Sequence, residues 1–560
     1  MAPETAPALR SDVPEPLPGA SGGAYRWYVL GLLMLIYAFN FIDRQVITIL
    51  APELKRDLGL TDAQLGLLYG TAFAMFYSLF GIPLAKLADG WSRVKTLAIG
   101  LTFWSAMTTL SGFASSFAQL GAARLGVGIG EASGSPAAVS LLSDYFPKAM
   151  RATALAIYTT GLYVGMGLSL VIGGYVLATW DGAFGLRGWQ AAFIVVGLPG
   201  VVLAAIVLLT VREPVRGGLD GVPAPGIERP FLAVLSEAAT MFPPFSLFML
   251  RRLGASGKLV AANGGVLLIG VLFAVIMTIV FDSLIPAKRN PVLLQAGGIA
   301  ITTSFIQWMS IGIGFYAAIS WVQAIRLRDP VAHALTVGNG AFLATAAAGG
   351  LLGVFTYSIG AFVFVYGTEF LGLDPRAGLW LGLIAAVSGL AGSSLGGFLA
   401  DIAKRRHPAG RLYILMAAVV GFAALTVFEF TTTSTTLFYI CHAFALLLLS
   451  AWPPILLATG QDLVIPRLRG TGFAIQALCT SLIGLGLGPY LVGAISDATG
   501  DLRTAILSLL LLVPPLMFVL IRCAALLPGA ERTVMERAMR LSAPAAIQRT
   551  RKNLLGESPV

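Results

Sequence analysis

RWYVLGLLMLIYAFNFIDRQVITILAP, residues 26–52, is long and apolar enough to form a helix that crosses a lipid bilayer. About 20 helical residues at 1.5 Å each cover the hydrocarbon core. Three polar residues, Asn40, Asp43 and Arg44, nevertheless lie near its middle, and their i, i+3, i+4 spacing places them on one helical face. A charge at that depth costs at least about 2.5–3.5 kcal/mol, so it usually faces a cavity or a partner. We therefore expect polar groups opposite this face; the alternative is that these charges only hold helices together.

Composition identifies the class of protein. Of 560 residues, 57% are hydrophobic and 11% are charged, and the mean hydropathy is +0.83. Soluble domains carry about 25% charged residues, so this chain is predicted to be a polytopic membrane protein. The net charge of +10 comes mostly from basic residues in short loops, which indicates membrane topology and not nucleic-acid binding. The three cysteines lie in apolar runs and imply no disulfide framework.

Apolar runs of spanning length divide the chain. We predict an all-α fold of about fourteen spans, in two six-helix bundles that are separated by an inserted pair of transmembrane helices. The predicted regions are a disordered tail (1–24), an N-terminal bundle (25–215), a linker with an interfacial segment (216–256), the inserted pair (257–328), a C-terminal bundle (333–527) and a basic tail (528–560). Residues 1–24 show no cleavable signal peptide. The placement of lysine and arginine predicts that both termini are cytoplasmic, although Lys55, Arg56, Lys288 and Arg289 are exceptions.

Two sequence echoes relate the bundles to each other. AKLADGWSRVK (85–95) resembles GFLADIAKRR (397–406), and SDYFPKAMRATALAI (143–157) aligns with QDLVIPRLRGTGFAI (461–475). The second pair superimposes Asp144 on Asp462 and Arg151 on Arg469. Parallel repeats with a binding site at their interface near the midplane are typical of one large class of transporters.

The fourth span supplies partners for Asp43 and Arg44. It reads AARLGVGIGEASGSPAAVSLL (122–142), in which Arg124 and Glu131 are seven residues apart and so lie on one face. Two carboxylates and two guanidiniums could then meet in one water-accessible cavity. Neighbouring carboxylates do not both ionise cheaply, and an arginine binds an anionic head group through forked hydrogen bonds. Protonation would free an arginine and deprotonation would recapture it; the alternative is a fixed ion pair.

Other residues are candidates for the same cavity. Glu369 and His442 could add titrating groups, although a lone intramembrane histidine is as often a packing residue. Aromatic residues could line an apolar route for a lipid tail, although such residues more often pack or lie at membrane interfaces. These aromatic candidates are Tyr37, Tyr69, Phe73, Tyr77 and Tyr366. The G-x-S-x-G pattern at 392–396 lies inside a predicted span, so we expect no enzyme. No nucleotide-binding loop and no metal-ligand spacing is present, so no cofactor and no metal is predicted.

Three motifs together resemble a known family. NFIDR (40–44), ADGWSRVK (88–95) and RLGVGIGEAS (124–133) look like the major facilitator superfamily, and within it most like the spinster-type branch. The resemblance implies alternating access, with Asp43 and Glu131 as the proton-coupling residues. It places Arg44 and Arg124 near them, and we predict that Arg44, Arg124 and Asn40 contact the substrate. Spinster-type members are associated with sphingosine-1-phosphate or lysophospholipids. Ser92, where glycine is common, and the inserted pair both depart from the family pattern.

The resemblance also implies a cytoplasmic gate at the loop signature, and we extend this expectation to its echo in the second half. Its residues are Asp89, Arg93, Lys95, Asp144, Arg151, Asp401, Arg405, Asp462 and Arg469. We therefore expect a monomeric, proton-coupled transporter of the cell (inner) membrane, with an amphipathic lipid as cargo. The alternative cargo is a small organic anion such as a sugar acid, taken up with protons.

Overall fold

The computed structural model describes residues 23–220 and 228–541. The stretch that decides the fold is one helix, α1 (Ala24–Leu58), in which the strongly apolar sequence continues through Pro52. The helix ends at Gly59, whose φ of 64° is a left-handed conformation that glycine adopts without the steric cost of a Cβ.

The N-terminal half contains the helices that follow α1. They are α2 (Asp62–Gly66), the π-helical turn η1 (Leu67–Thr71), α3 (Ala72–Gly90), α4 (Arg93–Ser111), α5 (Phe117–Glu131), α6 (Gly134–Tyr145), α7 (Lys148–Thr179), η2 (Ala183–Gly185), α8 (Gly188–Thr210) and η3 (Gly218–Asp220). The predicted fourth span is therefore broken into α5 and α6 at Ala132 and Ser133.

The linker and the insert follow. They comprise α9 (Pro230–Ala239), α10 (Phe245–Arg252), α11 (Gly257–Leu284), η4 (Ala287–Arg289), β1 (Val292–Ala296), β2 (Ile299–Thr302), α12 (Thr303–Arg328) and α13 (Pro330–Leu335). The antiparallel β1–β2 hairpin is a departure from the predicted all-α fold. It turns at Gly297 and Gly298, which both have positive φ, as tight hairpin turns require.

The C-terminal half repeats the arrangement of the first. Its elements are α14 (Gly340–Leu371), α15 (Ala377–Arg406), α16 (Gly410–Thr431), α17 (Thr435–Leu449), α18 (Trp452–Asp462), η5 (Pro466–Leu468), α19 (Arg469–Cys479), the π-helical turn η6 (Thr480–Leu485), α20 (Gly486–Thr499), α21 (Leu502–Ser508), η7 (Leu509–Leu512) and α22 (Val513–Arg532). The last helix extends past the predicted boundary at residue 527.

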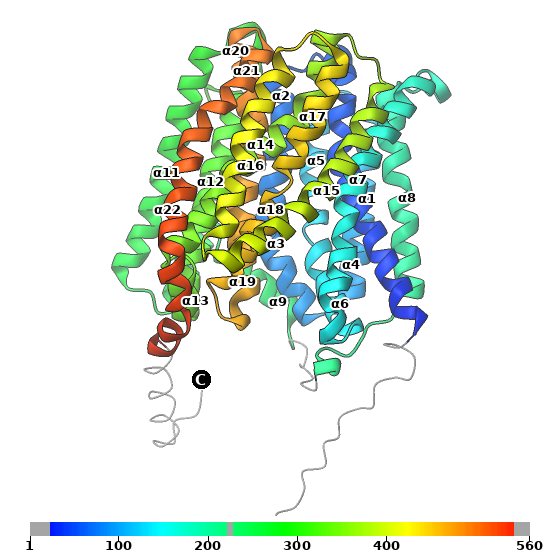
Figure 1. The fold of residues 1–560 in the computed structure, drawn as a ribbon. Coiled ribbons are helices and arrows are strands. Elements are labelled where there is room, and N and C mark those ends of the chain that lie inside the picture. Colours follow the sequence, from blue (N-terminus) through cyan, green and yellow to red (C-terminus); the bar gives the residue numbers. More distant parts are fainter. Residues whose placement is uncertain (1–22, 221–227, 542–560) are drawn as a thin grey trace, which may run out of the picture.

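Twelve of the described helical segments are long and apolar enough to cross a membrane, so the chain is an integral, multi-pass membrane protein. The predicted third and fourth spans, which correspond to α4 and to α5 with α6, are not among the twelve, and both lie within the N-terminal half. Figure 1 shows the start of α1 and the end of α22 at the same end of the bundle. We call this end the terminal side and the other end the opposite side.

The two halves contact each other closely on the opposite side. Lys55, near the end of α1, contacts Glu369, near the end of α14, with 2.8 Å between Nζ and Oε1. The carboxylate of Asp497 accepts the backbone N–H groups of Asp62 (3.2 Å) and Ala63 (2.8 Å) at the start of α2. A carboxylate at a helix N-terminus is stabilising because it satisfies free N–H groups there. The described conformation is therefore closed on this side.

Glycine allows the helices of the two halves to approach each other here. A Cβ on Gly66 would lie 2.3 Å from the carbonyl oxygen of Pro489, and a Cβ on Gly70 would lie 2.4 Å from that of Leu485. Small residues let helix backbones pack closely in membranes, where apolar side chains gain little by leaving lipid.

Gly66→Ala is therefore expected to disfavour the conformation that is closed on the opposite side. The new methyl group has to displace backbone, which costs about 1–3 kcal/mol in a packed core. The check is the thermal stability of the purified protein together with cysteine labelling on the opposite side. Gly31→Ala, where the Cβ meets no atom within 4 Å, is the matched control and should change neither. Equal behaviour of the two variants would contradict the close packing.

Candidate functional site

The polar face of α1 meets α5 inside the N-terminal half. Arg44 donates from Nη2 to Oε2 of Glu131 at 2.9 Å and to Oδ1 of Asn40 at 3.4 Å. Asn40 and Arg44 are each 6% exposed, and Asp43 and Glu131 are each 1% exposed. The predicted acids and bases are thus brought together, but the cluster is buried in this conformation and does not line the open, water-accessible cavity that we expected.

Arg124 holds α5 against the backbone of α1. Its Nη1 donates to the carbonyl oxygen of Asp43 at 2.9 Å, and its Nη2 donates to that of Arg44 at 3.4 Å. The side chain is fully buried. Arg124 was predicted to contact substrate, yet here it fixes the position of the two charged residues on α1.

Glycines explain how α5 approaches its neighbours. A Cβ on Gly128 would lie 2.7 Å from the carbonyl oxygen of Phe73 on α3, and one on Gly130 would lie 2.8 Å from Cβ of Trp104 on α4. The glycine-rich sequence of the fourth span therefore serves to insert Glu131 deeply between α1, α3 and α4.

Several polar atoms of the cluster lack a hydrogen-bond partner among the described residues. They are Oδ1 of Asp43, Oε1 of Glu131, Nε of Arg44 and Nε of Arg124. Buried polar atoms are nearly always paired, so each exception requires an explanation. An ionised carboxylate is costly where an oxygen has no donor, whereas a protonated carboxyl carries no charge. The cluster therefore has the chemistry of a site that can take up and release a proton.

Aromatic rings surround the guanidinium of Arg44. Its Cζ lies 4.7 Å from the ring centroid of Phe41, 4.3 Å from that of Phe73 and 5.0 Å from that of Tyr77. A cation is attracted to the faces of such rings, more strongly when water is excluded. Tyr37 stacks on Tyr158, with ring centroids 4.5 Å apart. The charged guanidinium of Arg44 is therefore enclosed by aromatic side chains.

Gln45 is a residue of this site that the sequence analysis missed. Its Nε2 donates to the carbonyl oxygen of Gly360 on α14 at 3.2 Å, and its Oε1 accepts from the hydroxyl of Tyr69 at 2.9 Å. Its place next to Arg44 in the sequence indicated that it lies near the site. Only the fold shows that Gly360 of α14 lies beside it. Gln45 links the charged cluster to the C-terminal half.

Three predicted residues lie outside the cluster. Glu369 pairs with Lys55 on the opposite side. His442 is buried in the C-terminal half, where its Nδ1 lies 2.8 Å from Oε1 of Glu429, a partner that the sequence analysis missed. Tyr366 is fully buried and donates to the carbonyl oxygen of Phe430 at 2.8 Å. The C-terminal half thus has its own polar and aromatic packing.

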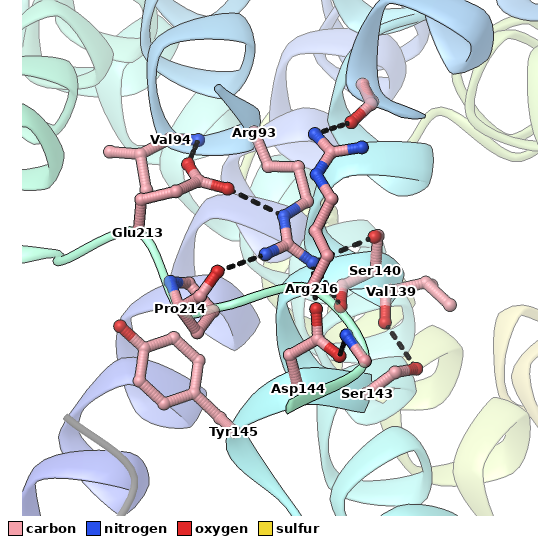
Figure 2. Close-up of polar contacts among 12 residues, drawn as sticks. Arg93, Val94, Val139, Ser140, Ser143, Asp144, Tyr145, Glu213, Pro214 and Arg216 are labelled. Carbon is pink, nitrogen blue, oxygen red and sulfur yellow. Dashed lines mark hydrogen bonds and ion pairs between the residues drawn. The ribbon is translucent and has the colours of Figure 1, made fainter. Parts of the chain in front are cut away.

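Two of the predicted gate residues of the N-terminal half, Arg93 and Asp144, belong to a network on the terminal side that also contains Glu213 and Arg216, which the sequence analysis missed. Figure 2 shows the guanidinium of Arg93 between the carboxylates of Asp144 and Glu213, with 2.7 Å from Nε to Oε1 of Glu213. Arg93 also donates to the carbonyl oxygen of Pro214 at 2.8 Å. Arg216 donates to the carbonyl oxygens of Ala88, at 2.6 Å, and Trp91.

A matching network lies in the C-terminal half. Arg411 pairs with Asp401, at 2.7 Å, and with Asp462, at 2.6 Å. Lys404 pairs with Asp462 and with Glu531, the latter at 2.8 Å. Asp462 therefore takes the place that Asp144 has in the first half, as the sequence echo suggests.

The other predicted gate residues are Asp89, Lys95, Arg151, Arg405 and Arg469. Asp89 and Lys95 are exposed, and so are Arg405 and Arg469. Arg151 donates from Nε to the carbonyl oxygen of Phe146 at 3.0 Å. Their roles in a gate remain predictions.

Glu213 lies outside the membrane-spanning segments, and its pKa is lowered. Burial alone would raise its pKa, but hydrogen bonds from the backbone N–H of Val94 and the guanidinium of Arg93 outweigh burial and lower the pKa. Because the folded pKa lies below the unfolded value of about 4.3, the contribution to stability is fully present above that value and is lost as pH falls through the lowered pKa. Glu213 is therefore ionised throughout the neutral range.

Glu213→Gln should lower the free energy of unfolding by about 1–3 kcal/mol, because the buried Arg93 loses one of its charged acceptors. The pH dependence of transport between about pH 5 and 8 should not change, because Glu213 does not titrate there. Chemical or thermal unfolding of the purified variant checks the first result and transport assays check the second. Glu536→Gln, which breaks an exposed pair with Arg540, is the control and should have little effect on stability. A shifted pH profile in Glu213→Gln would contradict the prediction that Asp43 and Glu131 are the proton-coupling residues.

The chain is similar to known proteins in sequence and in fold. The profile of the Major Facilitator Superfamily matches residues 33–489. An MFS-type efflux pump of Mycolicibacterium smegmatis is 36% identical over 198 residues, which are 35% of this chain and 44% of that protein. Protein spinster of Drosophila melanogaster is 31% identical over 202 residues, 36% of this chain and 32% of that protein.

A third relative is the probable galactarate/D-glucarate transporter GudP of Bacillus subtilis, 28% identical over 212 residues, 37% of this chain and 45% of that protein. The matched stretches thus span less than half the length of each of these relatives. Two crystal structures of a bacterial homologue of the human lysosomal transporter spinster, both inward-facing, have a TM-score of 0.62. They cover 92% of this chain and 99% of theirs, at 24% identity for the occupied and 26% for the unoccupied form.

Proposed function

Because the chain belongs to the major facilitator superfamily, we propose that it is a proton-coupled secondary active transporter that works by alternating access. The proposed cargo is an amphipathic molecule with an anionic head group, such as a lysophospholipid or a sphingoid phosphate. The observation that carries the proposal is the buried pair of Arg44 with Glu131, beside carboxylate oxygens of Asp43 and Glu131 that have no partner in the described chain.

Ionised Glu131 and the anionic cargo compete for Arg44 in this proposal. While Glu131 is ionised, its Oε2 holds the guanidinium of Arg44 at 2.9 Å. Protonation of Glu131 removes the negative charge and frees the guanidinium. A planar guanidinium binds a phosphate or carboxylate through two parallel hydrogen bonds, so the freed Arg44 takes the anionic end of the cargo. Loss of the proton reverses the exchange.

Asp43 and Gln45 have distinct parts in the same proposal. Asp43 lies on the backbone segment that Arg124 fixes, and we assign it the second proton-binding carboxyl. Gln45 binds Gly360 of the other half, so a change at Arg44 reaches the interface between the halves within one residue of chain. A ligand or proton shifts a conformational equilibrium only by its difference in affinity between the states, and this contact offers such a difference.

Two cargo classes fit the charged group. The aromatic wall of Phe41, Phe73 and Tyr77 supports an amphipathic cargo, because an apolar tail can pack beside the bound head group. The relative that is named a probable galactarate/D-glucarate transporter supports a sugar acid as the second candidate. A carboxylate would pair with Arg44 as well as a phosphate does.

Uptake by proteoliposomes under an imposed pH gradient tests both candidates. Fluorescent lysophosphatidylglycerol, whose head group is anionic, and radiolabelled galactarate are offered separately, with and without a protonophore. Gradient-driven, protonophore-sensitive movement of the lysolipid supports the first cargo class, and such movement of galactarate supports the second. Movement of either compound at the same rate without a gradient would contradict proton coupling.

We place the protein, as a monomer, in the cell membrane with both termini cytoplasmic, and this topology also belongs to the proposal.

A further inference from the structure

The inserted pair of helices lies along a line where the two halves meet. Besides the contact of α1 with α14, the halves touch along two seams: α2, η1 and α3 meet η6 and α20 at the first, and α7 meets α15 at the second. Helix α12 packs against α3 and η1 from the N-terminal half and against η6 and α20 from the C-terminal half. Figure 1 shows α11 at the outer edge of the molecule with α12 between it and the bundle. The insert therefore contacts both halves at the first seam.

Gln307 of α12 is hydrogen-bonded to both halves at once. Its Nε2 donates to the carbonyl oxygen of Gly486, the first residue of α20, at 2.9 Å. Its Oε1 accepts from the hydroxyl of Thr71, at the end of η1, with 2.5 Å between the oxygens. The Thr71 hydroxyl also lies within hydrogen-bond distance of the Gly486 carbonyl oxygen. Gln307 is fully buried, so these groups bind one another in place of water.

An apolar core surrounds this junction and is separate from the main core of the protein. It combines buried residues of all three parts: Ala63, Leu67 and Ala72 from the first half, Ala274, Ile285 and Trp308 from the insert, and Tyr490 and Ala494 from the second half. Dispersion contacts are the main source of helix association in membranes, so a three-part core favours the arrangement in which all three parts are in contact.

The insert also reaches the contacts on the opposite side. Nη1 of Arg289, in the segment between α11 and β1, donates to the carbonyl oxygens of Ser496 (3.3 Å) and Asp497 (3.2 Å). The carboxylate of Asp497 is the group that accepts the N–H groups of Asp62 and Ala63. The insert thus supports the end of α20 at the place where the two halves are joined.

We propose that the inserted pair holds the first seam closed on the opposite side, and that Gln307 is the positioning residue of this contact. Alternating access separates the halves on one side and then on the other. The contacts of Gln307 with Thr71 and Gly486 and the three-part core must break or rearrange when the opposite side opens. The insert thereby sets the ratio of the two conformations, whatever the cargo, so this inference does not depend on the cargo proposed above.

Two substitutions remove the hydrogen bond between Gln307 and Thr71, one at each of the two residues. Gln307→Leu keeps the approximate size of the side chain and removes both of its polar groups. Thr71→Val keeps the shape of Thr71 and removes its hydroxyl on the N-terminal half. Thr278→Val is the matched control, because Thr278 is a buried residue of the insert whose hydroxyl donates within its own helix, to the carbonyl oxygen of Ala274 at 2.7 Å.

Distances across the opposite side measure the conformation directly. Spin labels are attached at Phe113→Cys and Thr433→Cys, two surface positions in different halves, after replacement of the three native cysteines by alanine. Gln307→Leu and Thr71→Val should each raise the ratio of long to short distances by about three- to tenfold, the effect of one or two interhelical hydrogen bonds in a membrane. The double variant should change the ratio by less than the product of the single effects, because both remove the same contact.

Three results decide the inference. A shift in both single variants, with Thr278→Val unchanged, supports it. Unchanged distance distributions in folded Thr71→Val and Gln307→Leu would overturn it. An equal shift in all three variants would also overturn it, since it would indicate a general loosening of the insert. If Gln307→Leu does not fold, Thr71→Val and its control decide the question alone.

Discussion

Replacing Asp43 by Asn or Glu131 by Gln is expected to abolish proton-driven accumulation of cargo while leaving cargo exchange between equal pools intact. Each replacement keeps the size of the side chain and removes its ability to carry a proton. We expect a fall in gradient-driven uptake of at least about tenfold, because ionisable groups held in the membrane interior mark proton and ion pathways. The measurement is uptake by proteoliposomes with and without a pH gradient, beside counterflow exchange at equal pH.

Folding must be checked separately in the Glu131 variant. Removal of one partner from a buried ion pair costs about 3–5 kcal/mol, because the remaining charge is left without compensation. Asp43 forms no ion pair with the described residues, and its side-chain neighbours Thr108 and Trp104 are neutral, so Asp43→Asn is the cleaner variant. Glu536→Gln, at an exposed acid far along the chain, should behave as the unmodified protein. Gradient-driven uptake at the full rate in both cluster variants would remove the proton role from these residues.

Arg44→Lys is expected to weaken cargo binding by about tenfold or more, although the positive charge is kept. Lysine is a point donor on a flexible stem, whereas arginine presents a planar fork that matches a phosphate or carboxylate. The aromatic faces of Phe41, Phe73 and Tyr77 also suit a flat, weakly hydrated guanidinium better than an ammonium group. The measurement is the concentration dependence of uptake, in which the half-saturating cargo concentration should rise.

Arg503→Lys is the matched control for this prediction. Its guanidinium lies 4.9 Å from the ring centroid of Phe370, outside the α1–α5 cluster. The control therefore loses an arginine–aromatic contact without touching the proposed site, and its uptake should match that of the unmodified protein. Equal half-saturation in Arg44→Lys and Arg503→Lys would show that Arg44 does not bind the cargo.

The sequence predicted the fold class and the charged cluster because both depend on local patterns. Apolar length identifies the spans, and the spacing of Asn40, Asp43 and Arg44 identifies a polar face. The seven-residue spacing of Arg124 and Glu131 did the same for the fourth span. The family resemblance and the superfamily match agree on the fold. Spacing did not show that Arg124 would bind backbone carbonyl groups, since that depends on the distance between α5 and α1.

Local sequence patterns could not predict the contacts between segments that are distant in the chain. Gln45 looks like any polar residue at a helix interface until α14 is placed beside it. Gln307 is one of two glutamines in the apolar helix α12, and its two partners come from segments 236 and 179 residues away. Glu429 was overlooked because it lies 13 residues from His442, across the turn between α16 and α17. In all three cases the available signal was a polar residue inside a predicted span. The sequence did not identify the partner of that residue.

Cargo-driven proton movement is the most direct test of the claim that the Arg44–Glu131 exchange couples protons to cargo. Proteoliposomes with a pH-sensitive dye inside are given an outward or inward gradient of the cargo identified above, with no pH gradient imposed. The unmodified protein should change the internal pH in proportion to the cargo that crosses, and Asp43→Asn should move cargo down its gradient with no change in pH. Cargo crossing through the unmodified protein at constant internal pH would contradict the account.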